Sequence, residues 1–275
     1  MKPLLSELAL RRASTLDEAL AILRDDPRTP IAGATDIGVA LNFGTTTARR
    51  FLDITQVRAL RRIDTAGDTL VIGALSTYSD ILRSALVTER LPMLQQAAGQ
   101  TGGVQIQNRG TLAGNVANAS PAGDSLPVLA AADATIVLQS TRGERRVPMA
   151  DFYTGYRATV VQGDELITAI EIPRVPGRQW FRKVGTRAAQ AISKIVMAAV
   201  RDADSGILRV AVGSVAPTVV RATRTEELLA SGAGIDAAVR ALDGEIAPID
   251  DIRSTEVYRR RVAGNLLRRF WADSA

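Results

Sequence analysis

The stretch Gln107–Pro127 (QNRGTLAGNVANASPAGDSLP) constrains the fold more than any other part of the sequence. It contains only two charged residues, Arg109 and Asp124, and it is rich in glycine, alanine, serine and asparagine. Small and polar residues interrupt it too often for a helix, whereas it is too apolar for a disordered segment. Long ordered loops without secondary structure are uncommon and usually have a function. We therefore expect an ordered loop that either binds a ligand or packs as an Ω-like loop on its own core.

The amino-acid composition excludes several kinds of chemistry. The 275 residues include no cysteine and no histidine. Within this chain, that excludes disulfides, thiolate nucleophiles, the usual zinc sites, iron–sulfur ligands and catalysis that depends on histidine. Difficult chemistry would therefore come from a bound organic cofactor, and we expect no catalytic side chain and no metal site.

The net charge of +5 and the pI of about 10.0 raise the question of nucleic-acid binding. The basic residues, however, are spread along the chain beside 29 acidic ones, and aromatic residues make up only 4%. These features argue against a nucleic-acid partner. No window approaches the roughly eighteen apolar residues of a membrane span, and the start of the sequence does not resemble a secretory signal. We therefore expect no membrane span and a cytoplasmic location.

The order of patterns predicts an α+β protein of three units, because a short α/β segment is followed by hairpins, helices and a further run of strands. The first unit would cover residues 1–57. A helix at 14–25 with a capping box at Thr15, followed by a strand, a turn and a helix from about Asp36 to Asn42, predicts a small α/β lobe.

The second unit would cover residues 58–173 and would contain hairpins that turn at 66–68 and 142–143, with helices over 77–86, 91–100 and 125–133. The third unit, residues 178–275, follows a junction that contains proline and glycine. It would combine an antiparallel sheet with three helices.

The last predicted helix includes residues 255–271. Its apolar face would be formed by Val262, Leu266, Leu267 and Phe270. We expect this face to pack on its own domain with the arginines in solvent, and a docking surface for a partner chain is the alternative. In the segment FYTGYRAT we expect Phe152 and Tyr156 to be buried.

The loop from Ile31 to Asp36 is a candidate anion-binding segment. Its small residues allow the backbone to approach a ligand closely, and a helix that begins just after it offers free amides to an anion. Asp36 would repel a phosphate beside it, so we expect Asp36 to cap or brace the turn. An ordinary tight turn between a strand and a helix is the alternative, because short glycine-containing turns are weak signals.

The stretch that opened this section is the second candidate segment. Thr111, Asn115, Asn118 and Ser120 supply hydrogen-bond donors and acceptors without charge. Such groups beside small residues suit a flat heteroaromatic ring and a polyol linker. The alternative is that they satisfy the backbone of an Ω-like loop, and the residues alone favour neither.

Five segments, in this order and spacing, resemble one family. They are IAGATDIGVAL, VQIQNRGTLAGNVANASPAGDSLPVLAAADATIVL, FYTGYRAT, ELITAIEIP and RKVGTRAAQAISKI. The chain resembles the FAD-binding subunit or domain of molybdenum hydroxylases of the xanthine dehydrogenase and carbon monoxide dehydrogenase family. The resemblance extends from about residue 3 to about residue 271, and its second segment is long and specific.

The resemblance implies a two-lobed FAD-binding fold of the vanillyl-alcohol oxidase (PCMH) type, followed by a C-terminal α+β domain with an antiparallel sheet. The first loop would hold the FAD pyrophosphate through Ala32, Gly33, Ala34, Thr35, Asp36 and Ile37. The second loop would hold the ribityl chain, pyrophosphate and flavin through Thr111, Gly114, Asn115, Asn118, Ser120 and Asp124. Ile167 and Lys183 would complete the FAD site, where the lysine would stabilise negative charge.

The chain departs from the family pattern at several positions. Gln107 replaces an arginine, whereas Ala113 and Ala34 stand where glycines are common. A methyl group at either alanine is tolerable if φ is negative there. Ile72 stands where some relatives have a phenylalanine beside the flavin.

The function that the resemblance implies is electron transfer. Electrons would pass from 2Fe–2S clusters on an iron–sulfur partner chain to FAD here, and would leave to NAD⁺ or another acceptor. Hydroxylation would take place on a molybdenum-cofactor subunit. The absence of cysteine fits clusters that lie on another chain. The alternatives are a scaffold subunit without flavin and a free-standing flavin reductase.

Overall fold

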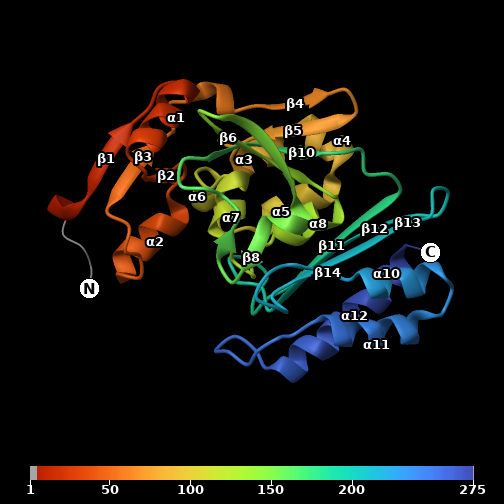
Figure 1. Cartoon of the computed structure of the whole chain (residues 1–275). Coiled ribbons are helices and arrows are strands. Elements are labelled where there is room, and N and C mark those ends of the chain that lie inside the picture. Colours follow the sequence, from red (N-terminus) through yellow and green to blue (C-terminus); the bar gives the residue numbers. More distant parts are fainter. Residues whose placement is uncertain (1–4, 275) are drawn as a thin grey trace.

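Three main β-sheets succeed one another along the chain, and helices fill the space between them (Figure 1). The structure, a computed structural model, describes residues 5–274, so the first four residues of the predicted first unit lie outside it. The first sheet lies at one end of the molecule and the last three helices lie at the other, with the second sheet between them (Figure 1). The predicted α+β class is confirmed, while the unit boundaries stay a prediction.

The first sheet is small and parallel. Its strands, in spatial order, are β1 (Ala9–Arg12), β3 (Arg50–Asp53) and β2 (Thr29–Ile31), and the helical elements beside them are η1 (Leu5–Glu7), α1 (Leu16–Asp25) and α2 (Thr35–Phe43). Only half of the predicted capping box of α1 is present. The Thr15 hydroxyl accepts from the Glu18 N–H at 3.2 Å, but the Glu18 carboxylate accepts from the Ser14 N–H at 2.7 Å rather than from the N–H of the N-cap residue Thr15. Sequence reasoning missed β1. All four of its residues are exposed, so the strand lacks the alternation of buried and exposed positions by which strands are recognised.

The second sheet is antiparallel, and both predicted hairpins are confirmed within it. Its strands, in spatial order, are β4 (Ile63–Ala66), β5 (Thr69–Gly73), β10 (Leu166–Ile172), β6 (Thr135–Ser140) and β7 (Gly143–Pro148). The remaining elements of this part are η2 (Arg58–Leu60), α3 (Tyr78–Arg83), α4 (Ala85–Arg90), α5 (Pro92–Gln100), α6 (Val104–Gln107), α7 (Leu112–Asn118), α8 (Leu126–Ala131), α9 (Met149–Phe152), β8 (Tyr153–Gly155) and β9 (Ala158–Thr159).

The third sheet is the predicted antiparallel one, followed by three helices. The strands of this sheet, in spatial order, are β11 (Arg178–Val184), β12 (Ile195–Asp202), β13 (Ile207–Gly213) and β14 (Val220–Arg221). The helices that follow are α10 (Thr223–Ala230), α11 (Ile235–Glu245) and α12 (Glu256–Asp273). Helices α5 and α8 contact one side of this sheet, and α10 and α12 contact the other.

Strand β12 joins the second and third parts because both of its faces are buried. Val196 and Ala198 pack into the core that also contains α5 and α8. Met197 and Ala199 pack into the core of α10, α11 and α12. A strand that is buried on both faces is continuously apolar, as Ile195–Val200 is. The first of these cores therefore holds the third sheet against the second part of the chain, and the other holds the last three helices against the same sheet.

The stretch predicted to lack secondary structure contains a helix, α7, so that prediction was wrong. The Thr111 hydroxyl accepts from the backbone N–H of Gly114 at 3.0 Å and caps this helix. Leu112 and Val116 are fully buried. One capping side chain and two buried residues thus outweigh the low helix propensity of the glycine and asparagines in the segment.

Three smaller expectations also differ from the structure. Ser84 divides the helix predicted over 77–86 into α3 and α4, because Ser84 ends the first and its hydroxyl caps the second. Phe152 is buried, but Tyr156 is 64% exposed because it lies in the turn between β8 and β9. The apolar face of α12 packs as predicted, whereas Arg259 on that helix is buried rather than solvated.

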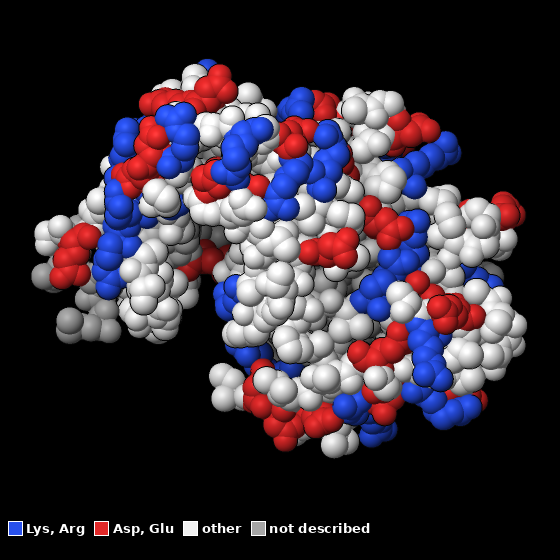
Figure 2. Space-filling model, in the orientation of Figure 1, with Lys and Arg blue, Asp and Glu red and all other residues white. Residues whose placement is uncertain are grey.

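The visible surface has no segregated charge. On the face shown in Figure 2, basic and acidic side chains lie next to one another along the upper edge and on the right-hand side, and the centre of the face is mostly uncharged. Among residues 5–274, every helix is too short or too polar to cross a membrane.

We expect Leu267→Ala to lower the free energy of unfolding by about 2–5 kcal/mol, because Leu267 is 0% exposed in the core of α12 and truncation leaves a cavity. The neighbouring Leu266 is only partly buried, so Leu266→Ala should be less destabilising. Urea denaturation followed by circular dichroism measures both variants. Equal losses of stability would contradict this description of the α12 face.

Candidate cofactor-binding site

Two neighbouring cavities open between the three parts of the fold. Cavity A, of about 540 Å³, lies between the loop after β2, helix α7 and the start of β10. Cavity B, of about 810 Å³, lies between the segment that joins α7 to α8 and the loops of the third part. Both cavities are lined by Thr35, Asp36, Thr101, Ile106, Asn115 and Asn118. They therefore adjoin, and we call the two together the cleft. Figure 2 shows the surface hollowed between the left-hand lobe, which carries the first sheet, and the rest of the molecule.

The first loop places backbone amides beside cavity A. Helix α2 begins at Thr35, with Ala34 as its N-cap. The first N–H groups of a helix have no partner within the helix, and the positive end of the helix dipole lies at the same place. Residues 32–37 all line cavity A. This loop can therefore hold an anionic group through its backbone.

Ala34 has a φ of 60°, so the condition of a negative φ is not met at this alanine. The left-handed region is unfavourable for a residue with a side chain by about 1–2 kcal/mol. Such strain is maintained only where the surrounding structure imposes it, often at a functional site. At Ala113 the condition is met, because Ala113 lies within α7 and is absent from the residues with positive φ.

Asp36 does not cap α2, so the expectation of a capping role was wrong. Its side chain makes no capping hydrogen bond, and the N-cap position belongs to Ala34. Asp36 lines both cavities instead. Protein atoms around its carboxyl group raise the pKa of Asp36 above its ordinary value, and Arg157 partly opposes this effect. The carboxyl group thus faces the ligand space rather than the helix end.

Gly33 allows the two loops to meet. A Cβ atom at Gly33 would lie 1.9 Å from the backbone oxygen of Arg109, which is far closer than real atoms approach. Only glycine permits this contact. The first loop is consequently held directly against the second, and both loops face the same cavity.

The second loop presents two asparagines whose side-chain oxygens already accept hydrogen bonds from other side chains. The Asn115 oxygen accepts from the Ser125 hydroxyl at 2.8 Å, and the Asn118 oxygen accepts from the Arg157 guanidinium at 2.9 Å. Each amide nitrogen therefore remains as the hydrogen-bonding group that the side chain can offer to a ligand. Because both residues line both cavities, these donors lie where the cavities adjoin.

Asp124 links the second loop to the third sheet. Its carboxylate accepts from the Lys183 ammonium at 2.6 Å and from the Ser193 hydroxyl. Lys183 also donates to the backbone oxygen of Gln100 at 2.9 Å. Burial raises the pKa of Asp124 above its ordinary value, while Lys183 and Ser193 oppose that effect. Asp124 lines cavity B, whereas Lys183 lies behind it and lines neither cavity.

The far wall of cavity B contains a second ionic cluster. Asp251 accepts from the Arg259 guanidinium at 2.7 Å, from the Arg253 guanidinium at 3.1 Å and from two backbone N–H groups. Burial opposes ionisation, but these hydrogen bonds outweigh it and lower the pKa of Asp251 from 3.8 to about 2. All three residues line cavity B.

The cleft brings together nearly all of the residues that the sequence singled out. Cavity A is lined by Ala32, Gly33, Ala34, Thr35, Asp36, Ile37, Thr111, Gly114, Asn115, Asn118 and Ile167. Ser120 and Asp124 line cavity B. Lys183 is the exception among the predicted residues, since its contact with the cleft runs through Asp124.

Sequence reasoning missed the walls contributed by the β8–β9 turn and by the third part of the chain. These walls include Arg157, Gln190 and Ser214, each of which has a positive φ. A positive φ at a residue other than glycine leaves no mark in a single sequence. Tyr78 was also missed, although it is buried and its hydroxyl lies 3.2 Å from that of Ser125.

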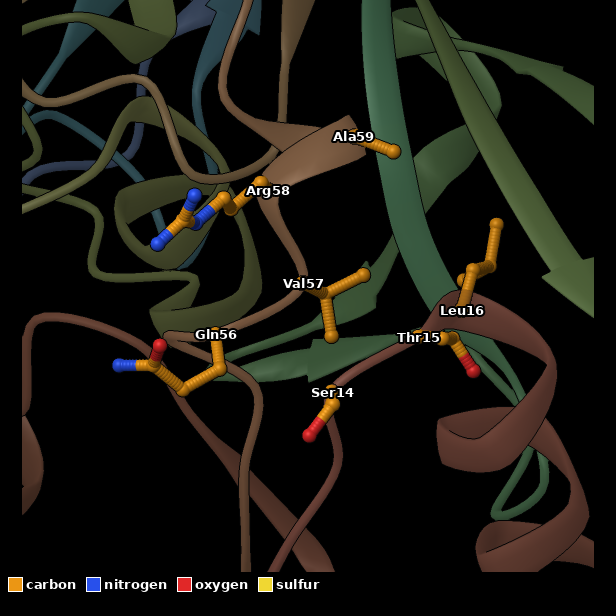
Figure 3. Close-up of a pocket in the computed structure, with 7 residues that line it drawn as sticks. All are labelled: Ser14, Thr15, Leu16, Gln56, Val57, Arg58 and Ala59. Atoms are coloured by element: carbon orange, nitrogen blue, oxygen red, sulfur yellow. The ribbon is translucent and has the colours of Figure 1, made fainter.

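A separate cavity of about 410 Å³ lies between the start of α1 and the segment before β4 (Figure 3). Ser14, Thr15 and Leu16 line one side of it, while the Arg58 side chain on the other side extends away from Thr15 (Figure 3). The Thr15 hydroxyl is engaged in capping α1. Within residues 5–274 there is also no group of acidic side chains arranged to hold a metal ion.

Residues 6–175 match the family model of the FAD binding domain in molybdopterin dehydrogenase, and residues 180–274 match that of the CO dehydrogenase flavoprotein C-terminal domain. The chain belongs to this family of FAD-binding dehydrogenase subunits. It is therefore an oxidoreductase subunit whose cofactor is FAD.

Relatives of known name match over most of their length. The glyceraldehyde dehydrogenase medium chain of Sulfolobus acidocaldarius is 32% identical over 93% of this chain and 94% of its own. The xanthine dehydrogenase FAD-binding subunit of Escherichia coli O157:H7 is 31% identical over 90% of this chain and 89% of its own. A solved structure of carbon monoxide dehydrogenase from Hydrogenophaga pseudoflava has a TM-score of 0.90 and 26% identity, and the match covers 100% of both chains.

The residues of the cleft fit FAD. The amides at the start of α2 suit a diphosphate, and the amide nitrogens of Asn115 and Asn118 suit a polyol or a ring edge. Ile167 and its neighbours give cavity A an apolar side. Cavities of this size and mixed lining are usual for small cofactors.

We expect Gly33→Ala to weaken FAD binding, because the added methyl group would separate the first loop from the backbone of Arg109. Gly38→Ala is the control, since a Cβ atom there meets nothing within 4 Å and alanine favours the helix interior. Titration of each apoprotein with FAD, followed by flavin fluorescence, measures the dissociation constants. Equal affinities would show that the close approach of the two loops does not govern the site.

We expect Asp251→Asn to reduce the acid sensitivity of the fold. The pKa of Asp251 is lowered in the folded protein, so its contribution to stability is present above pH 3.8 and is lost as the pH falls toward about 2. The free energy of unfolding, measured by urea denaturation across that window, should vary less with pH in this variant. Asp204→Asn, in an exposed turn, is the control. A pH profile that Asp251→Asn leaves unchanged would refute the role of this carboxylate.

Proposed function

We propose that this chain is the electron-transfer subunit of a molybdenum hydroxylase, in which FAD spans the cleft. The observation that carries the proposal is the lining of the cleft, where backbone amides, neutral amide side chains and an apolar wall meet from separate parts of the fold. The adenosine diphosphate part would lie in cavity A, and the flavin ring would lie in cavity B.

The residues of the chain bind and orient the cofactor in this proposal. The first loop holds the diphosphate through Ala32, Gly33, Ala34, Thr35, Asp36 and Ile37, of which Asp36 contributes its backbone rather than its carboxylate. Thr111, Gly114, Asn115, Asn118 and Ser120 hold the pyrophosphate, the ribityl chain and the ring, with Ile167 beside the cofactor. Asp124 and Lys183 fix the wall of cavity B. FAD supplies the redox chemistry when bound, so the chain needs no catalytic acid or base.

The electron donor would be an iron–sulfur partner chain that carries 2Fe–2S clusters. The 275 residues contain no cysteine, so the clusters require ligands from another polypeptide. A molybdenum-cofactor subunit would carry out the hydroxylation. The relatives support this arrangement, because one is named the carbon monoxide dehydrogenase medium chain, from Hydrogenophaga pseudoflava, and one matching structure is a Cu,Mo-CO dehydrogenase.

The electron acceptor would be NAD⁺ or another small oxidant that reaches the ring through cavity B. The side of that cavity formed by the third part offers Arg253 and Arg259 against one carboxylate, Asp251. A net positive wall favours an anionic acceptor such as a dinucleotide. Proline and isoleucine side chains at positions 217, 248 and 249 give the same wall an apolar surface.

We expect Asn118→Ala to weaken FAD binding about five- to tenfold, because one hydrogen bond is worth roughly 1 kcal/mol. Asn265→Ala, at an exposed position of α12, is the control.

Anaerobic addition of NADH to the FAD-loaded chain should bleach the visible flavin band. A chain that binds FAD, ignores NADH and also fails to accept electrons from co-expressed partner chains would contradict electron transfer.

A further inference from the structure

Arg259 differs from the other arginines of α12 because it is buried. It is 5% exposed, and its guanidinium points from the first turn of the helix toward cavity B. One terminal nitrogen donates to the backbone oxygen of Ser214 at 2.9 Å, and the other donates to Asp251 at 2.7 Å. Its Nε atom is buried and has no hydrogen-bond partner in the structure. A buried charge is unfavourable unless it is paired and hydrogen-bonded, so the bonds to Asp251 and Ser214 are what allow Arg259 to be buried.

Ser214 is the residue that Arg259 holds. It has a φ of 66°, which is unfavourable for serine. Its backbone N–H donates to the oxygen of Pro121 at 2.7 Å, and its hydroxyl donates to the backbone oxygen of Ser193 at 3.1 Å. Together with the bond from Arg259, these contacts fix both peptide groups and the side chain of Ser214 in the left-handed conformation.

The contacts of Ser214 lead directly to the second loop, Gln107–Pro127, which we call the FAD-binding loop because it is proposed to bind FAD. Pro121 belongs to that loop and lines cavity B, as does Ser214 itself. Ser193 in turn donates to Asp124, which is paired with Lys183. The neighbouring Gly213 has little room for a Cβ atom, which would lie 2.8 Å from the side chain of Val196 and 3.2 Å from the backbone oxygen of Pro121. The bend after β13 is therefore packed closely against the loop that shapes cavity B.

We propose that Arg259 is a positioning residue, which holds the Ser214 bend against the FAD-binding loop and so shapes the wall of cavity B around the flavin ring. The inference rests on the proposal that the ring lies in cavity B. Arg259 acts through the Ser214 carbonyl group and does not itself touch the reacting atoms. Its planar guanidinium can donate in two directions at once, to Ser214 and to Asp251, which a lysine cannot reproduce.

The test compares FAD binding in the full chain and in its Arg259→Lys variant, which keeps the positive charge. We expect the dissociation constant for FAD to rise by about tenfold or more, since a hydrogen bond from a charged group is lost. The visible absorption band of bound FAD should also shift, because the surroundings of the ring change. Arg261→Lys, at an exposed position two residues along the same helix, should alter neither quantity.

A rescue experiment separates positioning from general stabilisation. Glycine adopts the left-handed conformation without steric strain, so Ser214→Gly makes the bend less dependent on Arg259. The double variant S214G/R259K should therefore bind FAD within about threefold of S214G alone, with the absorption band restored. This double variant also carries the test if Arg259→Lys alone does not fold.

Two results would overturn the proposal. One is an Arg259→Lys variant that binds FAD with the affinity and spectrum of the unmodified chain. The other is a loss of affinity that Ser214→Gly does not relieve. If Asn118→Ala weakens FAD binding while Arg259→Lys does not, the cleft remains the FAD site and only the role of Arg259 is rejected.

Discussion

Cavity B depends on the hydrogen bonds that the buried carboxylate of Asp124 accepts from Lys183 and Ser193. Asp124 belongs to the FAD-binding loop, whereas its partners belong to β11 and to the turn before β12. A buried carboxylate without a partner is strongly unfavourable, so these elements have to meet. Strand β12 brings them together, because the face that carries Val196 and Ala198 packs into the core of the second part of the chain.

Backbone strain in the described residues is concentrated along the cleft. Four residues other than glycine with positive φ line it, namely Ala34, Arg157, Gln190 and Ser214. Ala119, which also has a positive φ, lies between Asn118 and Ser120, and both of these line cavity B. Strained conformations persist only where several contacts impose them. Several contacts from separate chain segments therefore hold these residues in place around the cleft.

Local patterns predicted much of the fold and half of the cleft. The N-cap at Thr15, the two hairpins and the α2 segment depend on neighbouring residues, so a sequence reveals them. The family resemblance supplied the residues of the two FAD-binding loops. The wall formed by Ser214, Asp251 and Arg259 could not be predicted, because it depends on contacts between distant segments. Lys183 is a second example of a long-range contact that the sequence could not predict. The family resemblance places Lys183 at the FAD site, but it does not reveal that the ammonium group contacts Asp124 rather than the cavity.

The central claim of this account is that one FAD molecule lies across both cavities. The most direct measurement is an experimental structure of the full chain with FAD bound. The account predicts density for the adenosine diphosphate part in cavity A, near the start of α2, and for the flavin ring in cavity B, between the Asp124 loop and the Ser214 bend. Density for the ring in cavity A, or for FAD outside the cleft, would contradict it.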